Sequence, residues 1–277
     1  MPRTKISILL PAYADSPFLE SCLISIREAI IPEQSNLIII LDRVSHRNAE
    51  LIRTFESKIP KIIIKNSNFG LVNSLNLGIR ESDSQFIARI DQDDWMGGRR
   101  LEKQLIFLRD NPDHVLVGSN VTLIDEGGKK IRESSYPLSN NSIRKDIFHR
   151  NVFAHPAVMY DRDAVVECGM YKHFYEGAED YELWLRLIKL GKVANLQESL
   201  TFYRQHSDQM STKNSHRQWI INEAVKASVR FNAKHNFSFD QNYNSIDEWY
   251  RGVILIRFKH KISMLKSHLI SKFRNSE

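Results

Sequence analysis

Cysteine is scarce in this 277-residue sequence, which contains only Cys22 and Cys168. Both lie in segments with an apolar pattern, so two buried free thiols are a better interpretation than a disulfide, and they indicate a reducing compartment. No stretch approaches the ~18 to 20 apolar residues of a membrane-spanning helix. The apolar run before Pro11 is too short for a secretory signal. These absences predict a cytoplasmic location.

Acidic residues are missing from one long segment near the C-terminus. Between Arg251 and Asn275 there are seven Lys and Arg and no Asp or Glu, so much of the formal net charge of +6 is concentrated there. A basic chain can bind nucleic acid, an anionic membrane surface or anionic substrates. No aromatic stacking motif of an RNA-binding sheet accompanies these basic residues, so we expect no nucleic-acid partner.

Neither an internal repeat nor a low-complexity linker divides the chain, and its first half alternates between strand-like and helical patterns. Short apolar segments are separated by segments whose apolar residues recur every three or four positions. The four predicted strands are Ile6–Leu10, Leu37–Leu41, Lys61–Lys65 and Gln85–Ile90. Each crossover has the length of a right-handed βαβ unit, so the sheet should be largely parallel and covered by helices on both faces.

The second half has a different pattern, with longer strand-like segments and fewer helices between them. The predicted strands are Val115–Asp125, Phe153–Tyr160 and Val193–Arg204, and the predicted helices are Glu179–Leu190 and Ser215–His235. Together the two halves predict an α/β fold with a mixed, mainly parallel sheet flanked by helices.

The end of the fourth predicted strand carries three carboxylates within four positions, at Asp91, Asp93 and Asp94. They would repel one another unless a cation lies among them. Open α/β sheets bind their ligands at the carboxyl ends of the strands, and hard oxygen ligands favour Mg²⁺ or Mn²⁺. The alternative is a polar turn whose Asp residues cap the next helix. The residues alone leave these two interpretations equally good.

Two other strand ends should lie along the same edge of the sheet. The first strand ends in Pro11, Ala12 and Tyr13, and the second ends at Asp42. A nucleotide laid across this edge would find Asp42 able to accept hydrogen bonds from a base or ribose, with backbone groups of the first strand close by. A helix N-cap is the stronger interpretation of Asp42 taken alone, and packing alone would explain Tyr13.

A series of motifs gives these segments a family resemblance. From about Lys5 to Ser211 the chain resembles the family 2 glycosyltransferases, nucleotide-sugar enzymes with the GT-A fold. One short motif would be weak evidence, but several in the right order are strong. The matching segments are Ile6–Tyr13, Gly70–Ile79, Ile87–Asp94, Arg100–Gln104, His155–Val158, Glu179–Trp184 and Tyr203–His206.

The resemblance implies roles for individual side chains. Asp93 and His206 would hold the metal, and Asp180 would be the general base that takes the proton from the acceptor hydroxyl. His155 and Glu179 would contact the acceptor. The residues implied for the nucleotide sugar are Pro11, Ala12, Tyr13, Asp42, Arg89, Asp91 and Gln92.

The same resemblance implies an inverting glycosyltransferase that uses Mn²⁺ or Mg²⁺. Its donor would be a nucleotide sugar, with a UDP-sugar favoured, and its acceptor a saccharide or a lipid-linked saccharide in surface polysaccharide or lipopolysaccharide synthesis. Many relatives carry paired carboxylates and a Gly after the second strand, but here Asp42 is followed by Arg43, which weakens the prediction of the base. The alternatives are a non-catalytic nucleotide-sugar-binding protein and a nucleotidyltransferase. The second would need a Gly-rich basic loop after the first strand, where this chain has Pro11–Asp15.

The resemblance divides the chain into a catalytic domain at 1–211 and a helical extension at 212–277. In the extension, apolar residues from Leu255 to Phe273 recur every three or four positions with Lys and Arg between them, which predicts a basic amphipathic helix. This helix would either pack on protein or lie on an anionic membrane. Because enzymes of the resembled family often act on lipid-linked acceptors, we favour the membrane. We expect an anionic membrane surface as a possible second partner and a peripheral location at the inner face of the cell membrane.

Overall fold

The structure is a computed structural model in which residues 6–207, 209 and 221–226 are described. Residues 221–226 are helical. The rest of the predicted C-terminal extension at 212–277, including its basic amphipathic helix, lies outside the described residues. No described helix has both the length and the apolar character that crossing a membrane requires.

The first half of the chain forms the predicted parallel sheet. Its strands lie in the order β3-β2-β1-β4, and all three neighbouring pairs are parallel. The strands are β1 (Ile6–Tyr13), β2 (Ser35–Asp42), β3 (Lys61–Lys65) and β4 (Phe86–Arg89). The helices between them are α1 (Leu19–Glu28), α2 (His46–Thr54) and α3 (Leu71–Glu81). The predicted alternation of strand and helix is therefore confirmed.

The second half extends the same sheet with mixed directions. β8 runs antiparallel between β4 and β6, whereas β6 and β9 are parallel, and β5 closes the far edge against β9. A short strand, β7, pairs only with β6. These strands are β5 (Trp95–Met96), β6 (His114–Ile124), β7 (Lys130–Glu133), β8 (Met159–Asp161) and β9 (Lys192–Arg204). The helices here are α4 (Arg100–Asp110), α5 (Asn140–Asp146), α6 (Arg162–Glu167) and α7 (Glu179–Leu187), with 3₁₀ turns η1 (His155–Ala157) and η2 (His173–Tyr175).

The strand predicted over Phe153–Tyr160 is wrong in most of its length. A 3₁₀ turn occupies its centre, and only β8 follows as strand. Pro156 has no N–H to give to a sheet ladder, which disfavours a strand here. The buried guanidinium of Arg100 instead binds the carbonyl oxygens of Pro156 and Val158, at 2.6 and 2.9 Å.

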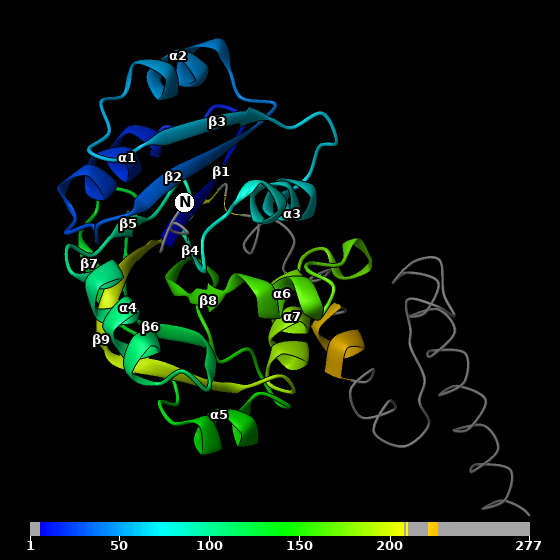
Figure 1. Cartoon of the computed structure of the whole chain (residues 1–277). Coiled ribbons are helices and arrows are strands. Elements are labelled where there is room, and N and C mark those ends of the chain that lie inside the picture. Colours follow the sequence, from blue (N-terminus) through cyan, green and yellow to red (C-terminus); the bar gives the residue numbers. More distant parts are fainter. Residues whose placement is uncertain (1–5, 208, 210–220, 227–277) are drawn as a thin grey trace, which may run out of the picture.

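Helices cover both faces of the sheet, and side-chain alternation along β1 explains how (Figure 1). Ile8 and Leu10 pack into a cluster with α1, α2 and α4, whereas Leu9 points to the opposite face and packs with α3, α6 and α7. Because successive strand residues face opposite sides, one apolar strand supplies two cores. Burial of each such side chain stabilises the fold by about 2 kcal/mol.

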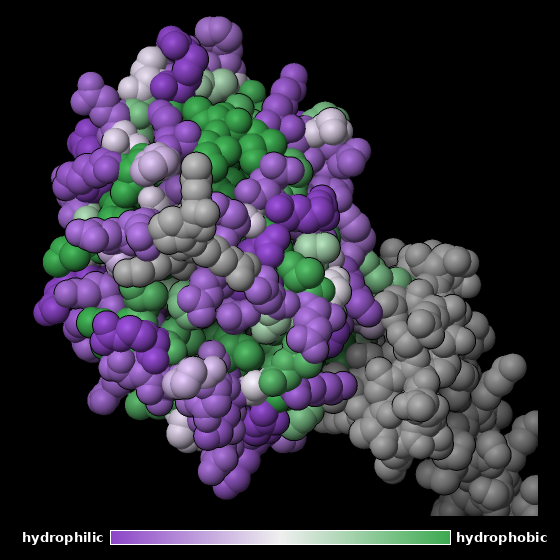
Figure 2. All heavy atoms as spheres, viewed as in Figure 1, coloured by the Kyte–Doolittle hydropathy of each residue, from purple (hydrophilic) through white to green (hydrophobic). Residues whose placement is uncertain are grey.

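The surface of the molecule is mostly hydrophilic, with an apolar patch over the outer edge of the sheet at β3 (Figure 2). There Ile62 and Ile63 are 39% and 37% exposed. β3 is the outermost strand, so its side chains lack a neighbouring strand on one side. Lys61 and Lys65 at the strand ends discourage pairing with another edge.

Candidate active site

A cleft of about 950 Å³ opens where β1, β2 and β4 end. This is the edge at which open α/β sheets bind ligands. All of the predicted site residues except His206 line it. The predicted residues in the lining are Pro11, Ala12, Tyr13, Asp42, Arg89, Asp91, Gln92, Asp93, His155, Glu179 and Asp180.

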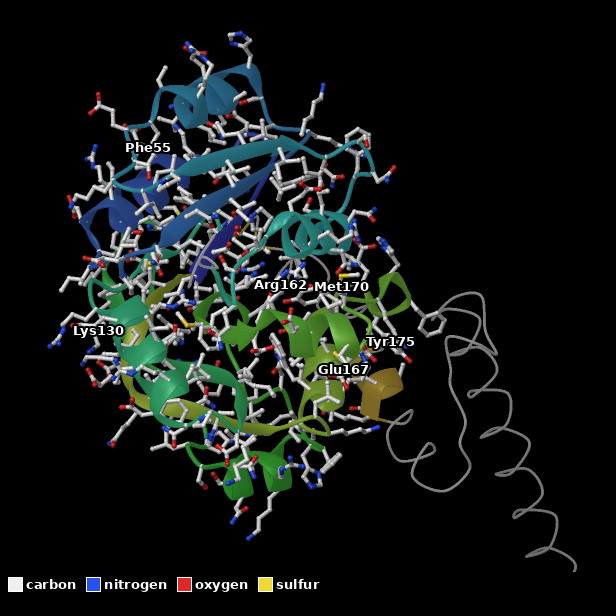
Figure 3. All side chains as sticks on the ribbon, viewed as in Figure 1. Phe55, Lys130, Arg162, Glu167, Met170 and Tyr175 are labelled. Carbon is white, nitrogen blue, oxygen red and sulfur yellow. The ribbon has the colours of Figure 1, made fainter. Side chains whose placement is uncertain are left out.

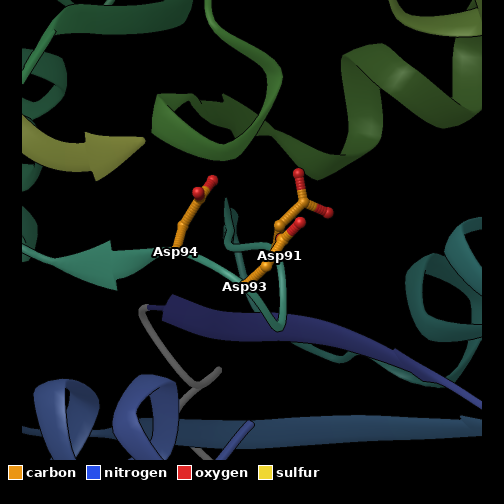
Figure 4. Close-up of side chains that lie close together, drawn as sticks. All are labelled: Asp91, Asp93 and Asp94. Atoms are coloured by element: carbon orange, nitrogen blue, oxygen red, sulfur yellow. The ribbon is translucent and has the colours of Figure 1, made fainter. Parts of the chain in front are cut away.

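Three carboxylates lie close together in the turn after β4 (Figure 4), and two of them, Asp91 and Asp93, line the cleft. One oxygen each from Asp91, Asp93 and Asp94 lies within 4.8 Å of the others. His206 joins this group, because its Nε2 lies 2.9 Å from Oδ2 of Asp93. Burial, and then the charge of the neighbouring carboxylates, raises the pKa of both Asp93 and Asp94. Oxygen ligands with one imidazole suit a divalent cation such as Mn²⁺, whose charge would relieve this repulsion.

Asp94 does not cap a helix, so that alternative for the carboxylate run is wrong. The next helix, α4, begins at Arg100 and has no side-chain cap. Asp94 is buried instead, and its Oδ1 accepts the backbone N–H of Arg204 at 2.8 Å. Among the described residues its Oδ2 has no hydrogen-bond partner, as expected for a group completed by a cation or water.

Arg204 fixes this turn from the far end of β9. Its guanidinium lies between the rings of Phe18 and Trp95, 4.6 Å from each centroid. Its Nε donates to the carbonyl oxygen of Asp93 at 2.9 Å, and its Nη1 donates to that of Glu126 at 2.7 Å. Because Arg204 lies two residues before His206, the same contacts hold the imidazole beside the carboxylates.

Two side chains cross-link the part of the cleft at the ends of β1 and β2. The Gln92 amide accepts the N–H of Tyr13 and donates to its carbonyl oxygen, both at 2.9 Å, and so joins the carboxylate turn to the end of β1. Asp42 accepts the N–H of Gly70 at 2.7 Å through Oδ2, and its buried Oδ1 has no partner among the described residues. Asp42 is not the cap of α2, because Ser45 accepts the N–H of Asn48 there.

Arg89 places a buried cation in the floor of the cleft. The side chain is 1% exposed and forms an ion pair with Asp91. Burial opposes the charge, but the carboxylate of Asp91 outweighs it and raises the pKa of Arg89. Burial raises the pKa of Glu179 and Asp180, and the charge of Arg89 opposes part of this rise. Arg89 therefore acts on both the carboxylate turn and the acidic pair of α7.

Glu179 and Asp180 lie at the N-terminus of α7 and face the cleft. Asp180 accepts the side-chain N–H of Asn151 at 2.8 Å, and Glu179 accepts the N–H of Gly177 at 2.6 Å. Burial, followed by the charge of Asp180, raises the pKa of Glu179 to about 7. Burial also raises the pKa of Asp180, which makes it a stronger base than an ordinary Asp carboxylate.

His155 lies deeper on the same side. Its Nε2 is 2.9 Å from the Tyr171 hydroxyl, and its ring packs edge-on against Trp184 at 5.8 Å. Burial, and then the charge of Arg89, lowers the pKa of His155 well below its ordinary value. The imidazole is therefore neutral, and it contributes a polar contact to the cleft without a charge.

Sequence reasoning assigned no role to several residues that line the cleft or hold its side chains in place, although one of them, Arg204, lies within the Tyr203–His206 motif. The Arg43 guanidinium stacks on the Phe69 ring at 4.2 Å, and the positive φ of 53° at Arg43 gave no signal in the sequence. Asn151 holds Asp180, and Arg204 holds the carboxylate turn. Further lining residues come from the segment around β7 and from the loop after α5, namely Arg132, Ser134, Ser135, Tyr136 and Arg150.

The fold is that of the GT-A glycosyltransferases. The crystal structure of S. aureus TarS in complex with UDP-GlcNAc superposes with a TM-score of 0.64 at 12% sequence identity. The match covers 80% of this chain and 66% of that chain. At this identity the likeness establishes the fold alone.

The sequence then places the chain within one family of such enzymes. The glycosyl transferase family 2 profile matches residues 7–179, and the chain belongs to this family. It is 34% identical over 197 residues to the amylovoran biosynthesis glycosyltransferase AmsE of Erwinia amylovora, covering 70% of this chain and 73% of the relative. It is 30% identical over 244 residues to the Escherichia coli UDP-Gal:alpha-D-GlcNAc-diphosphoundecaprenol beta-1,3-galactosyltransferase, covering 85% of this chain and 86% of the relative.

Proposed function

We propose that this glycosyltransferase is metal-dependent and inverting, and that it moves a hexose from a nucleotide sugar to a saccharide hydroxyl. The observation that carries the proposal is the presence in one cleft of two separate acidic groups. Asp91 and Asp93, with His206 in contact with Asp93, would form a cation-binding end, whereas Asp180 lies on α7 with a raised pKa. A single displacement needs these two functions on opposite sides of the transferred sugar.

At the donor end, Asp93 and His206 would hold Mn²⁺ or Mg²⁺, and Asp91 would share the metal or contact the ribose. The metal would neutralise the charge that develops on the departing nucleoside diphosphate. Tyr13, Asp42 and the backbone of Pro11 and Ala12 would line the nucleotide site, with Gln92 holding Tyr13 in place and Arg89 adding positive charge. A UDP-sugar donor is supported by the name of the E. coli relative, whose donor is UDP-Gal.

At the acceptor end, Asp180 would take the proton from the attacking hydroxyl. That oxygen forms a bond to the anomeric carbon as the bond from this carbon to the diphosphate oxygen breaks, so the configuration inverts. The hydrogen bond from Asn151 fixes the carboxylate of Asp180, and the raised pKa makes this carboxylate a better proton acceptor than an ordinary Asp. Glu179 and the neutral His155 would contact the acceptor sugar.

The biological acceptor would be a saccharide or a lipid-linked saccharide in the synthesis of a surface polysaccharide. The names of the amylovoran and diphosphoundecaprenol relatives support this. Such an acceptor would place the enzyme in the cytoplasm at the inner face of the membrane, with the basic extension at 212–277 as the proposed anchor. A non-catalytic nucleotide-sugar-binding role would require neither the metal end nor Asp180.

Two variants test the proposal in one set of assays. Asp180→Asn should lower kcat by about 10²- to 10⁴-fold while UDP binding in Mn²⁺ stays nearly unchanged. Asp93→Asn should weaken Mn²⁺-dependent UDP binding itself. Asp110→Asn, on the exposed end of α4, is the matched control and should change neither.

The measurements are calorimetric titration of UDP with and without Mn²⁺, and release of nucleoside diphosphate on incubation with UDP-sugars and saccharide acceptors. The anomeric configuration of the product, read by NMR, tests inversion. Near-normal turnover in Asp180→Asn would show that another group is the base, and tight UDP binding without metal would contradict the metal role.

A further inference from the structure

Two arginines, Arg132 and Arg150, line the cleft and have no part in the carboxylate turn. Arg132 lies on β7, opposite Leu123 of β6, and Leu123 also lines the cleft. Arg150 directly precedes Asn151, whose side chain donates to Asp180 at 2.8 Å. The second arginine is therefore anchored one residue away from the partner of the proposed base.

The Tyr136 hydroxyl lies within electrostatic range of Asp180 and of both arginines. The pKa of Tyr136 is raised by burial and then by the charge of Asp180, and it is lowered by the charges of Arg132 and Arg150. Such effects weaken with distance in a solvated cleft. Tyr136 itself is fixed, because its N–H donates to the side chain of Asn120 at 2.8 Å. The acceptor side thus has a fixed wall with two cations on it.

Both guanidinium groups are available to a ligand. Arg132 is exposed and has no ion pair among the described residues. Arg150 pairs with Asp146 one helical turn earlier, at 2.8 Å, but these side chains are 54% and 42% exposed. A solvent-exposed pair of this kind is weak and can exchange for a better partner.

The strand that carries Arg132 contributes little to the core. All four residues of β7 are exposed, and β7 pairs with β6 alone. Figure 3 shows Lys130 of this strand on one side of the molecule and Tyr175 of η2 on the other. The cleft receives Arg132 from the first side and Glu176 from the second. β7 therefore contributes Arg132 to the cleft while adding little to the core.

The donor diphosphate does not account for these arginines, because the carboxylate turn would bind it through the proposed cation. We propose that Arg132 and Arg150 bind an oxyanion on the acceptor, a phosphate or a carboxylate, and thereby hold the acceptor hydroxyl against Asp180. Guanidinium groups bind such anions through paired, charge-assisted hydrogen bonds. The inference rests on the proposed function and adds the chemical class of the acceptor.

The test uses three small probes on the full chain saturated with UDP and Mg²⁺, so that the donor end is filled. Glucose 1-phosphate, glucuronate and methyl glucoside are titrated by saturation-transfer NMR. We expect at least one of the two anions to bind more tightly than the neutral glycoside. In Arg132→Gln/Arg150→Gln that anion should bind about tenfold more weakly, whereas the control Arg109→Gln on α4 should match the wild type.

A preference for glucose 1-phosphate identifies a phosphate-bearing acceptor, and a preference for glucuronate identifies a uronic acid. Equal binding of all three probes would overturn the proposal, as would anion binding that survives in the double variant. UDP binding in the same samples separates the two levels. If UDP binds but neither anion binds more tightly than the neutral glycoside, the acceptor proposal alone fails. If the wild type shows no metal-dependent binding of UDP, the proposed function itself is contradicted.

Discussion

The buried carboxyl of Glu179 makes a prediction about stability that can be worked through in numbers. This side chain has a pKa of about 7 in the folded protein, whereas its ordinary value is 4.5. Between these values the folded state binds more protons than the unfolded state, so stability falls as pH rises through the window. The stabilising contribution is complete below pH 4.5 and is lost above pH 7. The difference of 2.5 pKa units corresponds to about 3 kcal/mol.

Glu179→Gln removes the ionisable group but keeps an oxygen that can accept the N–H of Gly177. Urea unfolding at a series of pH values from 5 to 8 should therefore show the variant gaining about 2.5 kcal/mol relative to the wild type across this range. Glu167→Gln, at the exposed end of α6, removes the same charge from the surface and should leave the pH dependence unchanged. Parallel stability curves for Glu179→Gln and the wild type would refute the reasoning.

Three further predictions concern the two ends of the cleft. Arg204→Lys should weaken Mn²⁺ binding about tenfold, because lysine cannot contact both the rings and the carbonyl oxygens that hold the carboxylate turn. Binding is measured by the EPR signal of free Mn²⁺, and equal affinity would show that the turn keeps its conformation without Arg204. His206→Ala should weaken the same binding, and a variant with wild-type affinity would exclude the imidazole as a ligand. As the pH is lowered, the initial rate should begin to fall at a pH above the ordinary pKa of an Asp, since Asp180 must lose its proton to act as base and its pKa is raised. A rate independent of pH down to about pH 4 would contradict this role.

Helices and strands with a clear apolar pattern could be predicted from the sequence, whereas short elements without one could not. β3 was predicted with its observed bounds, because three isoleucines between lysines leave little choice. The second half was harder, since β7 and α5 are short, β7 is exposed throughout and α5 has a single buried residue, so neither shows a clear apolar period. Pro156 argued against a strand within 153–160, but the surrounding apolar residues dominated that prediction.

Some residues of the candidate site could also be predicted from the sequence, and others could not. Strand-end residues such as Asp42 and Asp93 could be predicted, since a parallel sheet brings its carboxyl ends to one edge. Arg204 could not, because its contacts to Phe18 and Trp95 join residues far apart in sequence. The same holds for Arg132, whose relation to Asp180 depends on how β7 folds back on β6.

The bond from the backbone of Arg204 to Asp94 has a consequence for synthesis of the protein on the ribosome. It joins residues 110 positions apart, and the contact between His206 and Asp93 spans 113. Domains fold as the chain emerges, N-terminal parts first. The parallel sheet of β1 to β4 can therefore form early, but the cation-binding end stays incomplete until residue 206 has left the ribosome. If these residues bind a metal as proposed, a nascent chain would acquire metal affinity only when nearly all of the described fold has been made, so that metal loading would report a finished domain.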